Sequence, residues 1–395
     1  MKNRLVQAGI AMSLLCITLS AAAQLNSNFK YRKLPAAYMK KGGSVQAFAA
    51  AAPAAPAAKS MKSDAAGVFD LTTLLPRGYV KDGSVDYTDQ LQQGIQQHED
   101  VMFPDFPVAV NARGLTLRSN TSVRFQPNSK LLLLPNSKEN YEVLRLHQVK
   151  QVKVYNPVIT GDRKAHQGSG GQWGMGISVR GSQDVTIVSP VVSDCWGDGI
   201  YIGDISGKCS SNIIVNDAML DFNRRNGISV TCVNGLQLNR PVISNTSGTN
   251  PKSGIDIEPN SNTDVIDNIS INSPVTFNNG SAGIVVSLGK LTGKSLKDVN
   301  ITVRNHIDDG SFIGFYVYGT KRELPQPMKG SINVENPVWK NCQKKPFLYN
   351  SADYGVSTKL KNVEVKRTEA SREVTDNNAL MNIRKEAAQQ KVQVQ

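Results

Sequence analysis

The sequence is short of the features that mark several protein classes. After the first 23 residues it has no apolar stretch long enough to span a bilayer, so we expect no membrane anchor. Its four histidines and five cysteines show no spacing typical of a zinc site. It lacks the leucine template of leucine-rich repeats and the 3.6-residue period of helical repeats. No nucleic-acid-binding module is recognisable, so nucleic acid is not an expected partner.

The N-terminus predicts export. Two basic residues precede an apolar run at residues 10–19, and small residues follow up to Ala23. This order is typical of a signal peptide over residues 1–23, cleaved after Ala23. Leu15 stands before Cys16, where a lipidation motif needs a small residue, which argues against a lipid anchor. We therefore expect a periplasmic or extracellular protein.

Composition divides the rest of the chain into three parts. Residues 24–67 are rich in alanine and proline and predict a disordered linker. Residues 68–365 carry strand-like alternation and predict one domain. Residues 366–395 lose that alternation and predict a polar, charged tail, either helical or disordered. The net charge of +13 favours an anionic glycan as partner, and it equally fits a surface that is simply solvated.

A glycine-led strand motif recurs through the middle of the chain. Its form is glycine, apolar, any, apolar, and successive glycines lie 23 to 31 residues apart. A period of this size indicates a solenoid in which each unit buries its apolar face against its neighbours. The alternation indicates strands whose apolar residues point to one side. The six copies are Gly176-Ile177-Ser178-Val179, Gly199-Ile200-Tyr201-Ile202, Gly227-Ile228-Ser229-Val230, Gly254-Ile255-Asp256-Ile257, Gly283-Ile284-Val285-Val286 and Gly314-Phe315-Tyr316-Val317.

Two further strand markers share this repeat. A proline–valine pair begins a second strand, and apolar alternation around residues 185–187 and 269–271 marks a third. Asparagine, glycine, serine and aspartate fill the joints, as turns require. Three strands per coil predict an all-β fold, a right-handed single-stranded parallel β-helix. The proline–valine pairs begin at Pro157, Pro190, Pro241, Pro274 and Pro337.

In this pattern the chain resembles the pectin lyase-like family over roughly residues 68–365. The resemblance implies a short helix that caps the N-terminal end of the core, and the amphipathic residues 88–95 match it. Such a cap also protects a sheet edge. The family includes lyases, hydrolases, epimerases, adhesins and phage tailspikes, so the fold leaves the activity open. We expect a monomer, although tailspikes are trimers.

Outward residues of the glycine-led strands predict a candidate site. They stack into ladders with one rung per coil, about 4.8 Å apart. Polar groups concentrate in the second to fourth coils and give way to apolar and aromatic residues in the fifth and sixth. The polar patch holds Asp198, Arg224, Arg225, Asn226, Asp256 and Glu258. A preceding glycine-rich loop adds Asp162, Arg163, His166 and Trp173, and Trp196 and Tyr201 are further candidates to stack on sugar rings.

The resemblance to pectate lyases gives the leading hypothesis, β-elimination on an acidic polysaccharide. It implies a cation beside the uronate carboxylate and a base that takes the proton at C5. Calcium prefers oxygen ligands, which Asp198, Asp256 and Glu258 offer either to the metal or to substrate hydroxyls. The candidate bases are Arg225, Arg224 and His166, although an arginine base needs unusual surroundings.

Two alternatives stay open. Polygalacturonases resemble this chain in placing acids before the corresponding strands, and Asp198 matches the first such position. Arg225 and Asn226 stand where they have a pair of aspartates, and Ser253 stands where they have histidine. A glycoside hydrolase here would pair Asp198 with Asp256 or Glu258, about 10 Å apart over two coils, nearer the inverting separation than the retaining one. The other alternative is a glycan-binding β-helix without turnover.

Four cysteines remain after the expected cleavage. Export permits disulfides. Cys209 and Cys232 follow corresponding strands of adjacent coils and are placed to pair, with buried core thiols as the alternative. The other two are Cys195 and Cys342.

Overall fold

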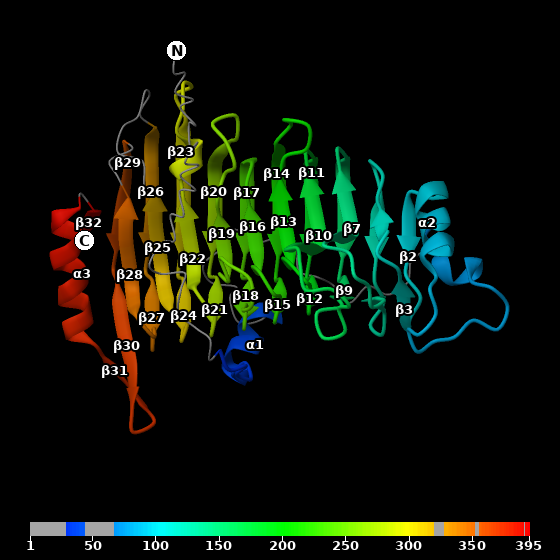
Figure 1. Ribbon diagram of the computed structural model, residues 1–395, viewed down its shortest axis with the longest axis horizontal. Coiled ribbons are helices and arrows are strands. Elements are labelled where there is room, and N and C mark those ends of the chain that lie inside the picture. Colours follow the sequence, from blue (N-terminus) through cyan, green and yellow to red (C-terminus); the bar gives the residue numbers. More distant parts are fainter. Residues whose placement is uncertain (1–28, 44–66, 320–327, 352–354, 391) are drawn as a thin grey trace, which may run out of the picture.

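The computed structural model describes residues 29–43, 67–319, 328–351, 355–390 and 392–395. The expected signal peptide and most of the expected linker lie outside these residues. The described chain is a solenoid of short parallel strands that stack into three long sheets (Figure 1). This confirms the all-β, three-strand coil that the repeat predicted.

The first sheet has twelve strands and contains the third marker. In sheet order its strands are β1 (Phe69–Asp70), β2 (Asp100–Met102), β5 (Ser122–Arg124), β8 (Lys150–Tyr155), β11 (Gln183–Val188), β14 (Ser210–Asn216), β17 (Val233–Asn239), β20 (Ile266–Asn272), β23 (Asp298–Arg304), β26 (Lys329–Glu335), β29 (Val356–Lys361) and β32 (Val392–Val394).

The second sheet has nine strands and contains all six glycine-led motifs. In chain order its strands are β4 (Leu115–Thr116), β7 (Asn140–His147), β10 (Trp173–Arg180), β13 (Ile200–Gly203), β16 (Ile228–Val230), β19 (Ile255–Ile257), β22 (Ala282–Ser287), β25 (Ile313–Gly319) and β28 (Lys345–Ser351).

The third sheet has eleven strands and contains the proline–valine marker. In sheet order its strands are β3 (Pro107–Val110), β6 (Lys130–Leu133), β9 (Val158–Thr160), β12 (Val191–Ser193), β15 (Met219–Asp221), β18 (Val242–Ser244), β21 (Val275–Phe277), β24 (Ile307–Asp309), β27 (Val338–Lys340), β30 (Glu364–Glu369) and β31 (Arg372–Thr375). The last pair, β30 and β31, is antiparallel.

Coil-to-coil register follows the sequence motif. Ile177 pairs with Ile200, and Ile200 pairs with Ile228, so the inward residues form continuous apolar rows. These residues are fully buried in one core cluster that runs along the solenoid. The middle residues form the ladder expected from the sequence, as in the pairing of Ser229 with Asp256. Burial of such rows is the main favourable term for folding a solenoid.

Left-handed residues close the turn before each proline–valine pair. Asn156, Ser189 and Asn336 have φ values of 54°, 50° and 53°. Small polar side chains tolerate this conformation better than bulky ones do. The asparagine- and serine-rich joints therefore have a direct backbone cause.

Helices cover both ends of the core. At the N-terminal end, α2 (Thr88–Gln97) buries Leu91 and Ile95 completely, which confirms the expected cap. The short 3-10 helix η1 (Leu71–Leu74) packs against it, and η2 (Gly289–Leu291) lies farther along the chain. At the other end, α3 (Asn377–Gln389) buries Ile383 and Ala387. The expected tail is thus ordered, because these two apolar residues cover the last coil.

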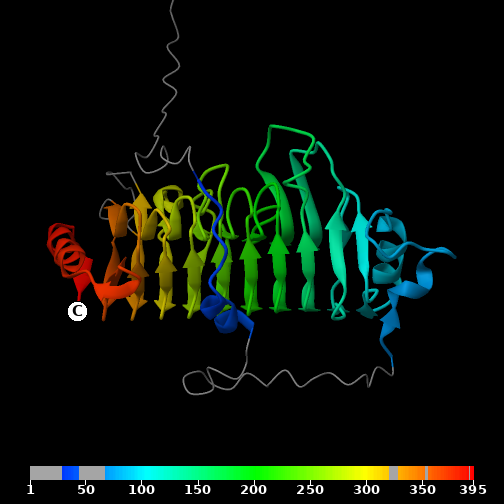
Figure 2. The ribbon, with the colours of Figure 1, turned by 90° about the horizontal axis from the view of Figure 1, so that it is seen from below.

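An N-terminal strap, residues 29–43, lies on the eleven-stranded sheet. It contains α1 (Ala36–Gly43) and appears as the blue segment that crosses the solenoid in Figure 2. The Tyr31 hydroxyl donates to Asp221 at 3.0 Å, and the Tyr38 hydroxyl donates to Asp309 at 2.9 Å. The sequence predicts a disordered linker here, and that prediction is wrong for residues 29–43, which form a helix and contact the sheet. The buried Tyr38 ring, beside Phe277, supplies the apolar contact that composition alone hid.

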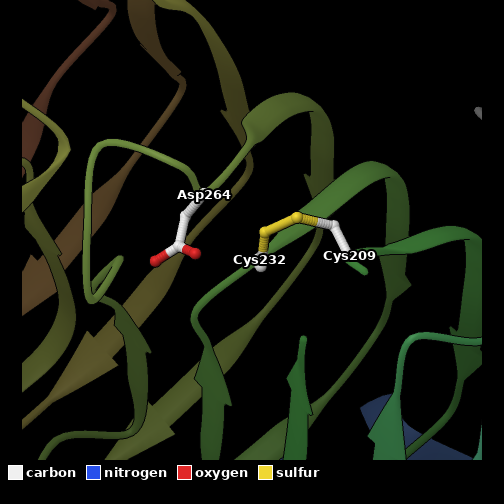
Figure 3. A group of neighbouring side chains, drawn as sticks. All are labelled: Cys209, Cys232 and Asp264. Carbon is white, nitrogen blue, oxygen red and sulfur yellow. A yellow bond between two sulfur atoms is a disulfide. The ribbon is translucent and has the colours of Figure 1, made fainter. Parts of the chain in front are cut away.

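One disulfide joins Cys209 and Cys232 on adjacent coils, as their spacing allowed (Figure 3). Asp264 lies beside it. Within the described ranges, Cys209, Cys232 and Asp264 form the one group of possible ligand side chains close enough to share a metal ion. The cysteines are bonded to each other, and Asp264 accepts from the backbone of Asn260 and Ser261. The group is therefore structural. Cys195 and Cys342 are free thiols.

No helix in the described part of the chain is long and apolar enough to cross a membrane.

Candidate functional site

The polar ladder forms a hydrogen-bonded carboxylate cluster on the outer face of the nine-stranded sheet. Arg225 Nη1 lies 2.9 Å from Asp198 Oδ2, and the backbone amide of Asn226 donates to Asp198 Oδ1 at 3.0 Å. The Asn226 side-chain amide donates to Asp256 Oδ2 and to Ser229 Oγ, both at 2.9 Å. Residues from three successive coils are thereby joined. The structure thus brings four of the predicted site residues into contact, namely Asp198, Arg225, Asn226 and Asp256.

Burial sets the ionisation of this cluster. Burial and the neighbouring Glu258 carboxylate raise the pKa of Asp256 well above its usual range, in spite of Arg225. Burial also raises the pKa of Asp198, and the Arg225 guanidinium opposes that shift. The upward shift is thus stronger for Asp256, which faces a second carboxylate, than for Asp198, which faces a guanidinium.

Arg225 is poorly suited to act as a base. Its burial disfavours the charged form, yet Asp198, Asp256 and Glu258 together raise its pKa above the ordinary arginine value. A base must be deprotonated when the substrate arrives. The geometry instead gives Arg225 the role of neutralising buried carboxylates.

Calcium does not fit these carboxylates as they stand. Both oxygens of Asp198 accept hydrogen bonds, from Arg225 and Asn226, and one oxygen of Asp256 accepts from Asn226. A guanidinium therefore occupies the place that a cation would need. Arg225 therefore takes the place of a metal ion beside Asp198.

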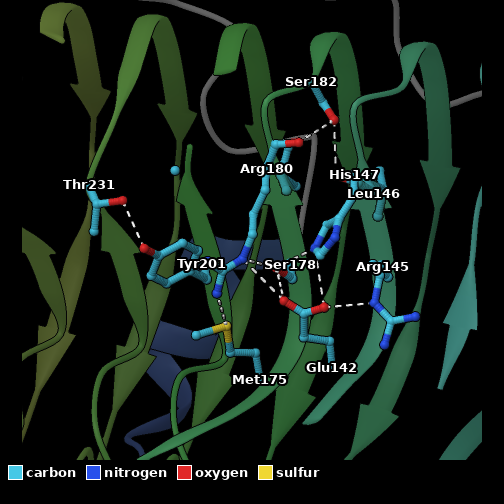
Figure 4. Close-up of polar contacts among 12 residues, drawn as sticks. Glu142, Arg145, Leu146, His147, Met175, Ser178, Arg180, Ser182, Tyr201 and Thr231 are labelled. Atoms are coloured by element: carbon cyan, nitrogen blue, oxygen red, sulfur yellow. Dashed lines mark hydrogen bonds and ion pairs between the residues drawn. The ribbon is translucent and has the colours of Figure 1, made fainter. Parts of the chain in front are cut away.

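A second charged cluster precedes the first by two coils and centres on Glu142 of β7 (Figure 4). Its carboxylate accepts from Arg145 Nε at 2.7 Å, Arg180 Nε at 3.1 Å and Ser178 Oγ at 2.7 Å. His147 Nε2 lies 3.1 Å from the same group. Burial alone would raise the pKa of Glu142, but the hydrogen bonds from His147, Arg145 and Ser178 lower it to about 2.

This Glu142 cluster carries excess positive charge. Two guanidiniums, those of Arg145 and Arg180, face one carboxylate, and arginine stays protonated in proteins. Arg145 donates its other two nitrogens to Thr116 Oγ1 at 2.8 Å and to the Arg113 carbonyl at 3.2 Å, and Arg180 Nη2 lies 3.5 Å from Met175 Sδ. Both arginines are only partly buried. A carboxylate or sulfate on a ligand would complete the charge balance.

A pocket of about 480 Å³ opens over this cluster. The half-exposed Trp173 and the ring of Tyr201 give it apolar walls. The Arg180 guanidinium lies 4.1 Å from the centre of the Tyr201 ring, and the Tyr201 hydroxyl lies 2.9 Å from Thr231 Oγ1. Its lining residues are Ala112, Asn140, Tyr141, Glu142, Arg145, Trp173, Arg180 and Tyr201. Trp173 and Tyr201, two of the residues predicted to stack on sugars, therefore line the pocket over Glu142.

Other expected site residues form a separate loop clamp. The Trp196 ring is sandwiched between His166, at 3.9 Å between ring centres, and the Arg224 guanidinium, at 3.8 Å. Arg224 Nη1 also donates to the Gly171 carbonyl at 2.9 Å, so its charge is engaged, although burial lowers its pKa. Both faces of Trp196 are covered, and it cannot stack on a sugar. Neither His166 nor Arg224 reaches the carboxylate cluster through a direct contact.

Asp162 and Arg163 belong to the same loop clamp. Asp162 is buried, and it accepts from the Tyr141 hydroxyl at 2.7 Å and lies 2.8 Å from His166 Nδ1. Arg163 stacks on Phe222 at 3.7 Å, and burial lowers its pKa to about 10. These contacts anchor the glycine-rich loop against the coils. They leave little of either side chain for a substrate.

Sequence reasoning missed Glu142, Arg145 and His147. Their strand, β7, pairs in register with β10, so Arg145 stands beside Ser178 in the middle-residue ladder. The segment from Leu144 to Leu146 has the apolar, any, apolar pattern but lacks the leading glycine. Searching for the alternation without the glycine would have found this coil.

The family model for the right handed beta helix region matches residues 175–365. Among curated proteins, the chain is 25% identical over 287 residues to the uncharacterized protein YclG of Bacillus subtilis (strain 168), covering 65% of this chain and 47% of that protein. The chain therefore spans about half the length of this curated relative.

Two solved structures are similar in fold. A family 28 exopolygalacturonase of Yersinia enterocolitica superposes with a TM-score of 0.55 at 12% identity, covering 78% of this chain and 66% of that one. The tailspike gp49 of Acinetobacter baumannii bacteriophage Fri1, a capsular polysaccharide depolymerase, gives 0.51 at 16% identity, covering 76% and 59%. With the family match, they establish the right-handed parallel β-helix.

Proposed function

We propose that this chain is a carbohydrate-active enzyme that hydrolyses an acidic polysaccharide on the outer face of its nine-stranded sheet. The observation that carries the proposal is the buried cluster of Asp198, Asn226 and Asp256, joined by hydrogen bonds across successive coils on the same sheet face as the pocket over Glu142. Burial and Glu258 raise the pKa of Asp256. The depolymerase and exopolygalacturonase of similar fold support a polysaccharide substrate as a class, although their identity to this chain is low.

Asp256 takes the role of general acid. Its raised pKa keeps the proton available for the departing glycosidic oxygen. Glu258 lies two residues further on the same face of the chain and is less buried, which suits the second carboxylate that activates water. A hydrolase needs such a pair in different environments. Asp198 and Arg225 hold the cluster together and are positioning residues.

The Glu142 cluster selects the substrate. Arg145 and Arg180 neutralise a uronate carboxylate or a sulfate, and Trp173 packs against a sugar ring. Tyr201 connects this pocket to the carboxylate cluster, since it pairs in the ladder with Ser229, which accepts from Asn226. One sugar would thus be held by charge while its neighbour is cleaved.

We also propose that the protein works outside the cytoplasm. The disulfide between Cys209 and Cys232 supports an oxidising compartment. A monomer is the proposed form, because helices α2 and α3 cover the two ends of the core.

The test is incubation of the full chain with polygalacturonate, alginate, a sulfated galactan and neutral glycans, with reducing ends and ultraviolet absorbance followed together. Hydrolysis of an acidic polymer predicts new reducing ends without the absorbance of an unsaturated uronate. Asp256→Asn should abolish product formation, whereas Asp298→Asn, an exposed acid on the twelve-stranded sheet, should not. Equal activity of Asp256→Asn and the wild type would refute the assignment.

β-Elimination is the second candidate. It needs positive charge beside the uronate carboxylate, and Arg145 and Arg180 supply that charge. Absorbance that rises in step with reducing ends would favour elimination over hydrolysis. Insensitivity of that signal to chelator would agree with the pairing of the Asp198 carboxylate with Arg225 in place of a metal.

A further inference from the structure

The twelve-stranded sheet carries a trough of about 880 Å³ on its outer face, separate from the pocket described above. Residues of strands β5, β8, β11, β14, β17 and β20 line it, together with Asn120 and Thr121 directly before β5. Its walls are residues of this sheet and its flanking turns, and none of them belongs to the carboxylate or Glu142 clusters.

A repeated backbone feature shapes this trough. Gln151, Asp184, Asn212 and Asn268 have φ values of 56°, 55°, 53° and 54°. The sheet register skips these positions, since Gln183 pairs with Lys150 and Val185 with Val152. Each left-handed residue leaves the ladder on both neighbouring strands without shifting the register, and its backbone turns the strand at that point. Because these residues stack from coil to coil, the strands turn at the same height along the trough.

Four polar side chains in the trough lie on one ladder and have no hydrogen-bond or ion-pair partner among the described residues. Ser122, Lys153 and Thr186 occupy one ladder, and Ile214 and Gln237 continue it through the next two coils. Within the described chain, the side chains of the four polar members make no hydrogen bond or ion pair. Successive rungs lie about 4.8 Å apart, so the ladder presents evenly spaced donors and acceptors.

The charge of the trough differs from that of the pocket over Glu142. Its lining holds one lysine, Lys153, and one acid, Asp184, and the latter accepts from Asn212 at 3.0 Å. Amides and hydroxyls make up most of the rest. Such a surface has no net attraction for an anion, and it can exchange hydrogen bonds with many hydroxyl groups.

We propose that this trough binds a neutral stretch of polysaccharide in an extended conformation, lying across the coils. The occupant is a chain of uncharged sugars whose hydroxyls meet the Thr186 and Gln237 side chains. The site is independent of the proposed cleavage reaction. Together with the proposed site for acidic sugars on the nine-stranded sheet, the trough would make the molecule bivalent toward a glycan that contains both acidic and neutral sugars.

The experiment is affinity electrophoresis of the full chain in gels that contain a linear glucan, a mannan, a galactan or polygalacturonate. Thr186→Trp should fill the trough and weaken retardation by a neutral polymer about tenfold. Thr302→Trp is the matched control, because Thr302 lies on the same ladder outside the trough and should leave retardation unchanged. Gln237→Ala, which adds no bulk, should weaken it to a lesser degree.

Two further readouts separate this site from the proposed active site. Asp256→Asn and Arg180→Ala should keep wild-type retardation in the neutral gel, and added salt should have little effect there. The proposal is wrong if none of the three neutral polymers retards the chain. It is also wrong if Thr186→Trp and Thr302→Trp behave alike while both retain the wild-type circular dichroism spectrum, or if Arg180→Ala abolishes neutral binding.

Discussion

The two halves of the nine-stranded sheet share one backbone and differ completely on their outer face. In the first half, Asp198, Asn226 and Asp256 form a buried polar cluster. In the second half, equivalent ladder positions carry Val285 and Tyr316, which pack into a small apolar cluster. Both halves keep continuous inward apolar rows, in which phenylalanine replaces isoleucine at Phe315 and Phe347. The inward rows therefore specify the fold, and the outward rungs are free to vary.

This contrast has an energetic meaning. Val285 and Tyr316 gain stability by leaving water, as apolar groups do. Burying Asp198 and Asp256 costs free energy unless each charge is paired or neutralised. A solenoid that is stable with an apolar outer face gains nothing from the polar cluster, which is why we assign chemistry to the polar half.

The largest expected effect is on turnover in the polar half. Asp256→Asn removes the proton donor while keeping the hydrogen bond from Asn226, and should lower kcat by about 10²–10⁴. Initial rates of reducing-end release measure it. Val285→Thr, at the same ladder position one coil later, is the control and should leave the rate within about twofold. A similar loss in both variants would contradict the division into halves.

The next effect is on stability. Arg225→Ala leaves Asp198 buried without its cation, and should cost about 3–5 kcal/mol of unfolding free energy. Urea denaturation followed by circular dichroism measures it. The double variant Asp198→Asn with Arg225→Ala should recover part of that loss, since no buried charge is left unpaired. No recovery would mean that Arg225 acts through packing.

A smaller effect should separate binding from catalysis. Arg180→Ala removes one cation from the pocket over Glu142, and should raise KM for an acidic substrate about tenfold with little change in kcat. Neutral substrates should show no change. Arg304→Ala, an arginine paired with Glu335 on the twelve-stranded sheet, is the matched control. A fall in kcat alone would argue against a role in substrate selection.

The smallest expected effect concerns a buried acid beneath the apolar half. Burial raises the pKa of Asp308 from 3.8 to about 7, although Ser311, Thr276 and Cys342 donate hydrogen bonds to it. The folded state therefore binds more protons than the unfolded state between those values, and stability should fall as the pH rises through that window. The melting temperature of the wild type should drop relative to Asp308→Asn as the pH rises from 5 to 8.

His306 has a lowered pKa and should therefore change stability with pH in the opposite direction, which provides an internal control for the Asp308 prediction. Burial lowers its pKa to about 3, so stability should fall as the pH drops below 6.5. This loss should persist in Asp308→Asn, because the substitution leaves His306 in place. A difference between the two proteins that does not change with pH would refute the raised pKa of Asp308.

The sequence predicted the fold well because inward alternation is a local property. Residues such as Ile200 and Ile228 reveal both strand and register through their spacing. The same ladder logic found Asp198 and Asp256. It could not show that Trp196 is covered on both faces, since His166 and Arg224 reach it from separate loops. Contacts made by a folded-back loop depend on three-dimensional closure, which spacing does not encode.

Average composition hides local anchors. The strap and the C-terminal helix are polar overall, and each is anchored by a few apolar side chains such as Tyr38 and Ile383. Composition therefore predicted a disordered strap, which is wrong, and left the tail either helical or disordered, of which α3 is the helical case. The Glu142 coil was missed because Val143 replaces the marker glycine.

The strap also has a consequence for the order of folding. Strands of neighbouring coils are close in sequence, so the coils can form progressively from a growing chain. The strap differs, because Tyr31 and Tyr38 contact residues 190 and 271 positions later. It cannot finish docking until Asp309 has been made and its coil has formed. Its docking is therefore a late event, and protection of residues 29–43 from protease would report that the solenoid is complete.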